Sequence, residues 1–198
     1  MPGVGTKIVT DSHDYQSSFR GAKIELVVFG EEDFKARLTW VEFSNLHLLE
    51  VQEGLAHIAF ISFAPKSVFV SFPTHFDRPP VWNGVELHLG DIVFHSLGEC
   101  GHQRVTGPSR WATISLSAER LAKYGTLLAD IELVAPSVGR ILRPPASAAT
   151  RLRRLHGKAC RLAETKPGIV AHQEVARSLE QDLILALVEC LAAEAVHV

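Results

Sequence analysis

The chain has 198 residues, which is enough for one large domain or for a domain with an appendage. Its composition, 46% hydrophobic and 21% charged, is ordinary for a globular protein with a core. A formal net charge of −2 argues against contact with nucleic acid by the chain as a whole. No apolar stretch is long enough to span a bilayer, and residues 1–10 lack the pattern of a signal peptide, so we expect a cytoplasmic protein without a membrane partner. The sparse cysteines predict neither a disulfide framework nor a zinc site: Cys100, Cys160 and Cys190.

The N-terminal two thirds of the chain reads as an arm followed by β structure. Residues 1–21 are polar and contain Gly and Ser, which predicts an arm rather than part of the core. Residues 22–145 then carry short runs rich in Val, Ile, Leu, Phe and Thr with turn residues between them, a pattern typical of a barrel-like β domain. A Pro-Pro pair predicts a loop over 74–83, and Ser117 is placed to cap a short helix near 118–128. The strands are expected within 24–29, 36–43, 47–51, 55–63, 67–72, 85–89, 91–95 and 111–116.

Residues 146–198 show helical periodicity and predict an antiparallel helical hairpin. One helix is expected over 146–165 and the other over 169–196, with Lys-Pro-Gly between them. The first helix is rich in Arg and Lys, and the second is rich in Glu and Asp. Either these opposite charges determine how the two helices, or two subunits, meet, or the charged residues only form two solvated faces. A leucine stripe on the second helix is the predicted dimerisation surface, and the alternative is that it packs on the first helix or on the β domain: Leu179, Leu183, Leu187 and Leu191.

Histidines close to a predicted turn raise the possibility of a metal centre. Two histidines and a carboxylate can hold iron, manganese or zinc in a β-barrel, so a cupin-like metalloenzyme is the alternative function. The spacing does not favour it, because no His-x-His pair puts two ring nitrogens on one strand face. There is also no Gly-x-Ser-x-Gly nucleophile elbow, so we expect no catalytic residues, no metal and no cofactor. The candidate cluster consists of His88, His95, Glu99 and His102.

Aromatic and basic residues on or beside the predicted strands suggest a small-molecule pocket. Aromatic side chains fill a barrel core by default, but a lumen lined by a few of them with polar fixing groups also makes a ligand site. The ligand would be a modest organic molecule, anionic if an arginine points inward. The predicted ligand-binding residues are Trp40, His57, His75, Arg78, Trp82, His95, Arg104 and Trp111.

Several soft motifs, in order, resemble the sensor half of AraC-type bacterial transcription regulators. They are Phe34–Thr39, Gly101–Arg104, Gly107, Trp111, Ile114–Leu116, Leu121, Arg151–Leu152, Leu155–His156 and Glu174–Gln181.

The resemblance implies a transcription regulator, not an enzyme. Its expected fold is α+β, a cupin-like β-barrel or sandwich without metal, followed by the C-terminal helical hairpin. It also implies a small-molecule effector in the barrel, a homodimer, and contact with DNA only through a helix-turn-helix domain of about a hundred residues. The chain stops at Val198, where that domain would begin, so we expect a truncated regulator rather than a stand-alone sensor. A pure assembly domain with a filled barrel is a further alternative.

Overall fold

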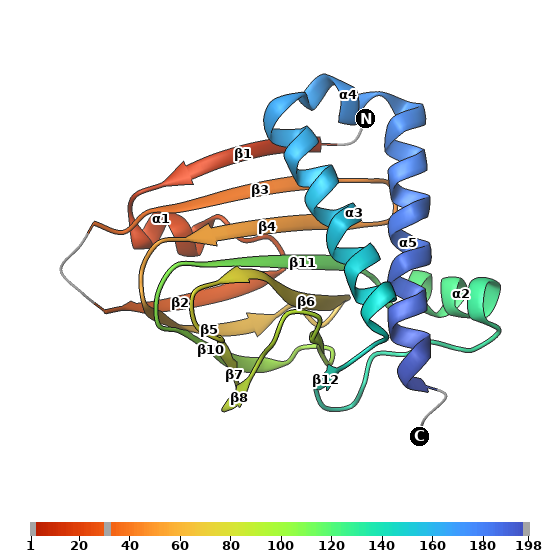
Figure 1. Ribbon diagram of the computed structural model, residues 1–198, viewed down its shortest axis with the longest axis horizontal. Helices are drawn as coiled ribbons and strands as arrows, with labels where there is room; N and C mark the ends of the chain where they lie inside the picture. Colours follow the sequence, from red (N-terminus) through yellow and green to blue (C-terminus); the bar gives the residue numbers. More distant parts are fainter. Residues whose placement is uncertain (1–2, 30–32, 196–198) are drawn as a thin grey trace.

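The computed structural model describes residues 3–29 and 33–195, and its strands form two facing antiparallel sheets (Figure 1). The larger sheet has seven strands in the order β1-β3-β4-β11-β6-β9-β12. They span Gly3–Val9, Ala36–Glu42, His47–Glu53, Ser109–Ser117, Ser67–Phe76, Ile92–Phe94 and Arg140–Leu142. The smaller sheet has five strands in the order β2-β5-β10-β7-β8. They span Ala22–Val28, His57–Phe63, Cys100–Val105, Val81–Trp82 and Val85–Glu86.

Both faces of the larger sheet are apolar, and this explains its near-continuous hydrophobic runs. On β6, Phe69 points into the space between the sheets while Phe72 packs under the C-terminal helices. On β11, Trp111 and Ile114 divide in the same way. The smaller sheet buries one face only, so its strands alternate between core and solvent, and Phe60 of β5 is half exposed.

The structure corrects the expectation of an arm over residues 1–21. Strand β1 pairs along its whole length with β3, and α1 (Ser12–Ser17) follows, capped by the Asp11 side chain. Val9 and Tyr15 are buried in the core between the sheets. Gly5 has a steric role, because a Cβ there would collide with the ring of Trp40 on β3. Most residues of this segment are polar, so its composition did not reveal the few apolar side chains that anchor it in the core.

The structure also corrects the loop expected over residues 74–83. Strand β6 continues to Phe76, and β7 occupies Val81–Trp82. The ladder between β6 and β11 shifts register between Arg110 and Trp111, opposite Pro73. Such an irregularity lets a residue without an N–H group stay in a strand.

The helix expected near 118–128 is α2 (Ala118–Ala129), and it begins where the Ser117 hydroxyl accepts the backbone N–H of Arg120 at 3.2 Å. The C-terminal hairpin consists of α3 (Ala146–Thr165) and α5 (Gln173–Ala195), joined by the short helix α4 (Pro167–Ala171) instead of an open turn. Figure 1 shows α3 and α5 lying across one face of the larger sheet. Within the described residues, no helix has the length and apolar character that crossing a membrane requires.

The leucine stripe predicted to mediate dimerisation is buried within the single chain. All four leucines belong to the core formed by α5, its neighbouring helices and the outer face of the larger sheet: Leu179, Leu183, Leu187 and Leu191. Helical periodicity identified the buried face of α5 but not the surface that covers it. The charges of the hairpin contribute little, because its Arg151–Glu189 pair, at 3.2 Å, is substantially exposed.

Leu187→Ala should therefore destabilise the fold rather than dissociate a dimer. Leu187 is 1% exposed, and removing a buried leucine side chain costs about 2–5 kcal/mol through lost burial and the cavity that remains. Urea denaturation followed by circular dichroism would measure the loss. Leu97→Ala, at an exposed leucine, is the control and should change the free energy of unfolding by less than about 1 kcal/mol. A folded, fully stable and monomeric Leu187→Ala protein would contradict this assignment.

Candidate functional site: the lumen between the sheets

A cavity of about 80 Å³, open in part to solvent, lies between the two sheets. Strands of both sheets line it, and the aromatic rings of Tyr15 and Phe19, at α1 and just after it, are part of its wall. This volume exceeds the roughly 10–15 Å³ that one water needs, but it is well below the roughly 300–1,000 Å³ of common ligand pockets. The lumen is thus largely filled by side chains and leaves a small space.

Aromatic side chains form one wall of the cavity. Phe63 of β5 and Phe69 of β6 lie with their ring centroids 4.7 Å apart. The indole of Trp82 meets the His95 imidazole edge-on, with 4.9 Å between the centroids. Trp111 also lines the cavity, and its indole N–H has no hydrogen-bond partner among the described residues.

A hydrogen-bonded relay ends at this aromatic wall. His95 follows β9, and its Nδ1 lies 3.3 Å from Oε2 of Glu99, while its Nε2 lies 3.1 Å from Oγ of Ser71. Ser71 lines the cavity on β6, and its Oγ is 3.4 Å from Oγ1 of Thr113 on β11. The order from the surface to the lumen is Glu99, His95, Ser71, Thr113.

The environment fixes the protonation states in this relay. Burial lowers the pKa of His95 and outweighs the opposing effect of Glu99, so the imidazole is neutral near pH 7. Burial alone would raise the pKa of Glu99, but hydrogen bonds from His95, the Ser96 backbone and Trp82 lower it overall, so the carboxylate is ionised. An ionised carboxylate can only accept, so Nδ1 of His95 carries the proton and Nε2 accepts one from Ser71.

Glu99, His95 and Ser71 have the order of an acid, base and nucleophile in hydrolases. The backbone around Ser71 does not suit that chemistry. Ser71 lies within β6, paired with Thr113 of β11 on one side and Val93 of β9 on the other. The sheet ladders use the backbone N–H groups that an oxyanion hole would require. The arrangement can orient a hydroxyl group toward a bound molecule.

A second buried polar cluster lies at the α1 end of the lumen. Tyr15 and Ser109 donate hydrogen bonds to the two carboxylate oxygens of Glu53, the second at 3.1 Å. Nε2 of His57 lies 3.4 Å from the same carboxylate, and its Nδ1 is 3.0 Å from the backbone oxygen of Leu55. Burial and the Glu53 charge raise the pKa of Tyr15, so its hydroxyl stays protonated and ties α1 to the sheets.

The structure separates the predicted ligand-binding residues into three groups. Trp82 and Trp111 line the cavity, and His95 lies directly behind Ser71. His57 is buried in the Glu53 cluster, and Trp40 covers Gly5 instead of lining the cavity. His75, Arg78 and Arg104 are exposed, so neither arginine meets the condition under which an anionic ligand was expected in the lumen.

Sequence reasoning missed the two hydroxyl residues of the relay. Ser71 and Thr113 sit inside apolar strands, where an isolated Ser or Thr carries no functional signal. The alternative metal cluster is not assembled, because His95 and Glu99 meet while His88 and His102 are exposed elsewhere. In the described part of the chain, no group of three or more His, Cys, Asp or Glu side chains is arranged to hold a metal ion.

His156 is a buried histidine outside the lumen, between α3 and the outer face of the larger sheet. Its ring lies edge-on to Phe72, at 5.6 Å between centroids, and its Nδ1 is 3.7 Å from Sγ of Cys160. Burial lowers its pKa from 6.5 to about 4, and the nearby backbone groups of Thr113 and Leu49 oppose this shift only in part. The neutral imidazole thus packs between α3 and the strands β11 and β4.

Acidification should therefore destabilise the protein through His156. Because the pKa is lower in the folded than in the unfolded state, the unfolded chain binds more protons between about pH 6.5 and 4. This contribution to stability is complete above about pH 6.5 and falls by up to about 3 kcal/mol as the pH approaches 4. Urea denaturation between pH 7.5 and 4.5 should show that the free energy of unfolding falls less steeply with decreasing pH for His156→Gln than for wild type. His102→Gln, at an exposed site, should keep the wild-type slope, and equal slopes for all three proteins would contradict the assignment.

Comparison with known proteins identifies the fold. No protein-family model and no curated protein sequence matches the chain. Among solved structures, it is similar to the one described as the AraC-like transcriptional activator CuxR, with a TM-score of 0.63 and 16% sequence identity. The match covers 96% of this chain and 70% of that chain. At this identity the likeness is one of fold, and it confirms the expected α+β fold, an AraC-like β domain followed by C-terminal helices.

Proposed function

We propose that this chain is the effector-binding and dimerisation region of an AraC-type transcription regulator. It would act on DNA through a helix-turn-helix domain outside this sequence, and it has no catalytic role of its own. The observation that carries the proposal is a lumen with an oriented polar group, inside a fold that matches an AraC-like activator over 96% of this chain. The motifs that resemble AraC-type sensors support it further.

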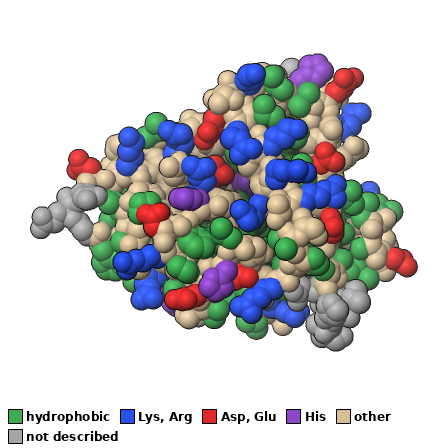
Figure 2. All heavy atoms as spheres, in the orientation of Figure 1, with side chains coloured by type: hydrophobic (Ala, Val, Ile, Leu, Met, Phe, Trp, Pro, Cys, Tyr) green, Lys and Arg blue, Asp and Glu red, His purple; other side chains and the backbone are tan. Residues whose placement is uncertain are grey.

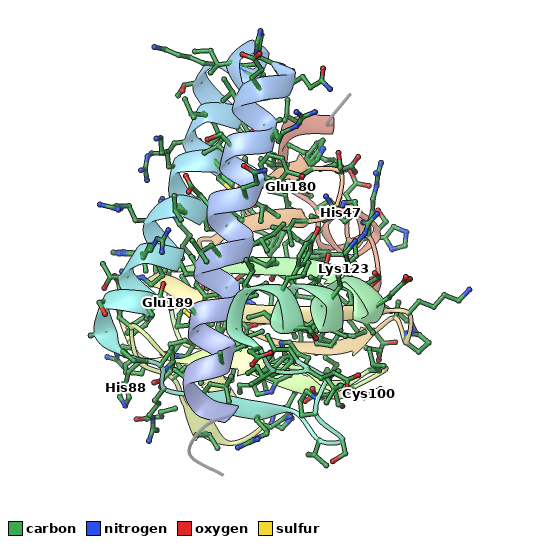
Figure 3. The ribbon with its side chains drawn as sticks, turned by 90° about the vertical axis from the view of Figure 1, so that its right-hand side faces the viewer. His47, His88, Cys100, Lys123, Glu180 and Glu189 are labelled. Carbon is green, nitrogen blue, oxygen red and sulfur yellow. The ribbon has the colours of Figure 1, made fainter. Side chains whose placement is uncertain are left out.

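The surface proposed for dimerisation is the groove between α2, α5 and the β3–β4 turn. This groove has a volume of about 650 Å³. Leu127 and Leu128 of α2 are 67% and 46% exposed on its wall, and Leu185 of α5 is 40% exposed. Figure 3 shows α2 lying beside α5, with Lys123 and Glu180 on the two helices. Large exposed apolar side chains grouped in one groove are a feature of interaction surfaces.

A second copy of this chain is the occupant that the charges favour. Arg177 lines the groove with Leu185, and the exposed Asp182 lies one helical turn before Leu185 on α5. This part of α5 thus carries both signs of charge and can pair with its own two-fold copy. The exposed face of α3 cannot do so, because Lys and Arg side chains gather over it (Figure 2). Arg154, Lys158 and Arg161 are exposed there, and two copies of this face would repel one another.

Leu127→Glu together with Leu128→Glu should convert the dimer into a folded monomer. The change places two charges in the proposed contact but disturbs little of the core, because both side chains are exposed. Sedimentation equilibrium at tens of micromolar would measure the mass, and circular dichroism would check the fold. Leu97→Glu, at an exposed leucine outside the groove, should remain dimeric. A wild-type chain that is strictly monomeric would overturn the proposed dimerisation.

A reporter assay tests dimerisation through this groove inside cells. The chain would be fused to a DNA-binding domain that represses its operator only as a dimer. Wild type and Leu97→Glu should repress, and the double Glu variant should lose at least tenfold in repression because the half-sites are no longer occupied together. Equal repression by all three fusions would contradict the proposed surface.

A further inference from the structure

We infer that the lumen binds a small uncharged molecule of single-ring size that carries a hydroxyl or N–H donor, of which a phenol is the simplest example. The inference rests on the proposed sensor function and names the chemical class of its effector. Four features of the cavity carry it: the direction of the relay, the aromatic wall, the absence of a usable charge among the described lining residues, and the volume.

The relay presents hydrogen-bond acceptors to the lumen. The Ser71 proton is committed to Nε2 of His95, because the Glu99 carboxylate holds the other ring nitrogen in its protonated form. In the 3.4 Å contact between the two hydroxyls, Thr113 must then donate to Ser71. Both protons are in use, and the remaining lone pairs of Ser71 and Thr113 face a ligand. A donor on that ligand satisfies them, whereas a molecule with acceptors alone does not.

The surrounding wall suits a flat apolar body. Phe63, Phe69, Trp82 and Trp111 line the cavity together with aliphatic side chains. Aromatic rings pack well against such surfaces in edge-on and offset arrangements. A sugar-like molecule with hydroxyls on every side would leave most of them without partners here, and burying such groups is costly.

The cavity offers no charge to pair with an ionic ligand. Glu53 is the acidic residue of the lining, and Tyr15, Ser109 and His57 already surround its carboxylate. Arg20 is the one Arg or Lys among the described lining residues, and its side chain is 86% exposed and paired with Glu42. A buried anion would stay unpaired, which is unfavourable. The cavity of about 80 Å³ is smaller than the roughly 150 Å³ of a cavity that holds benzene, so one ring is the upper limit of ligand size and its entry requires the lining to move outward.

Calorimetric titration with matched single-ring probes tests the inference. Phenol supplies a donor, anisole only an acceptor, toluene neither, and benzoate a negative charge. Phenol should bind the wild-type chain about tenfold more tightly than toluene, the effect of one hydrogen bond to an oriented acceptor. Anisole, whose oxygen can accept only from donors of the lining such as the Trp111 N–H, should not gain from the relay, so its affinity should be the same for wild type and Ser71→Ala. Benzoate should bind more weakly than toluene. The inference would be overturned if toluene bound as tightly as phenol, or if benzoate bound more tightly than phenol.

Variants of the relay localise the effect. Ser71→Ala should bring phenol to the affinity of toluene and leave toluene binding unchanged. Ser62→Ala, on the exposed face of β5, is the matched control and should keep the tenfold preference. Thr113→Val gives a second probe of the same hydroxyl pair and should weaken phenol several-fold, so the test holds even if Ser71→Ala folds poorly. If Ser71→Ala and Thr113→Val both fold and both keep the wild-type preference for phenol over toluene, the role of the relay is refuted.

Failure of this inference is distinct from failure of the proposed function. If none of the four probes binds while the reporter fusion is dimeric and responds to a sugar or an organic acid, the chain is a sensor with a different effector class. If the probes bind as expected but the fusion neither dimerises nor represses, the lumen site stands and the regulatory proposal falls.

Discussion

The seven-stranded sheet of this protein is apolar on both faces, and the rest of the structure depends on covering them. Residues such as Phe69 and Phe72 alternate along β6, so neither side can face water. The smaller sheet and α1 cover the inner side, and the α3–α5 pair with α2 covers the outer side. A sheet of this kind cannot stand alone, because its burial supplies the main driving force for folding. The leucine stripe of α5 is buried against this sheet and the neighbouring helices, so contacts with other molecules must use a different surface.

The same sheet separates the lumen from the helices by a single layer. Strand β11 carries Thr113, whose side chain belongs to the relay and whose backbone lies near the imidazole of His156 on α3. A change in the lumen and a change in the helical pair thus meet at one residue. This contiguity gives the proposed sensor a direct physical connection between the lumen and the helices.

The N-terminal segment is part of the two-sheet fold and not an appendage. Tyr15 lines one end of the lumen, and its hydroxyl is fixed by the buried Glu53 carboxylate, which Ser109 and His57 also approach. A buried carboxylate is stable only with such partners, so the position of α1 and the hydrogen bonds of Glu53 depend on each other.

The sequence by itself determined the local elements, and tertiary structure decided what they meet. Hydrophobic periodicity and the cap at Ser117 located most strands, α2 and the C-terminal helices, because these signals depend on neighbouring residues. The same local signals could not place residues 3–17 in the sheet, since the anchors Val9 and Tyr15 are few. They showed that α5 has a buried face but not that it faces its own chain. Ser71, His95 and Glu99 come together only through strand pairing and the turn after β9, so the relay that gives the lumen its chemistry has no local signature.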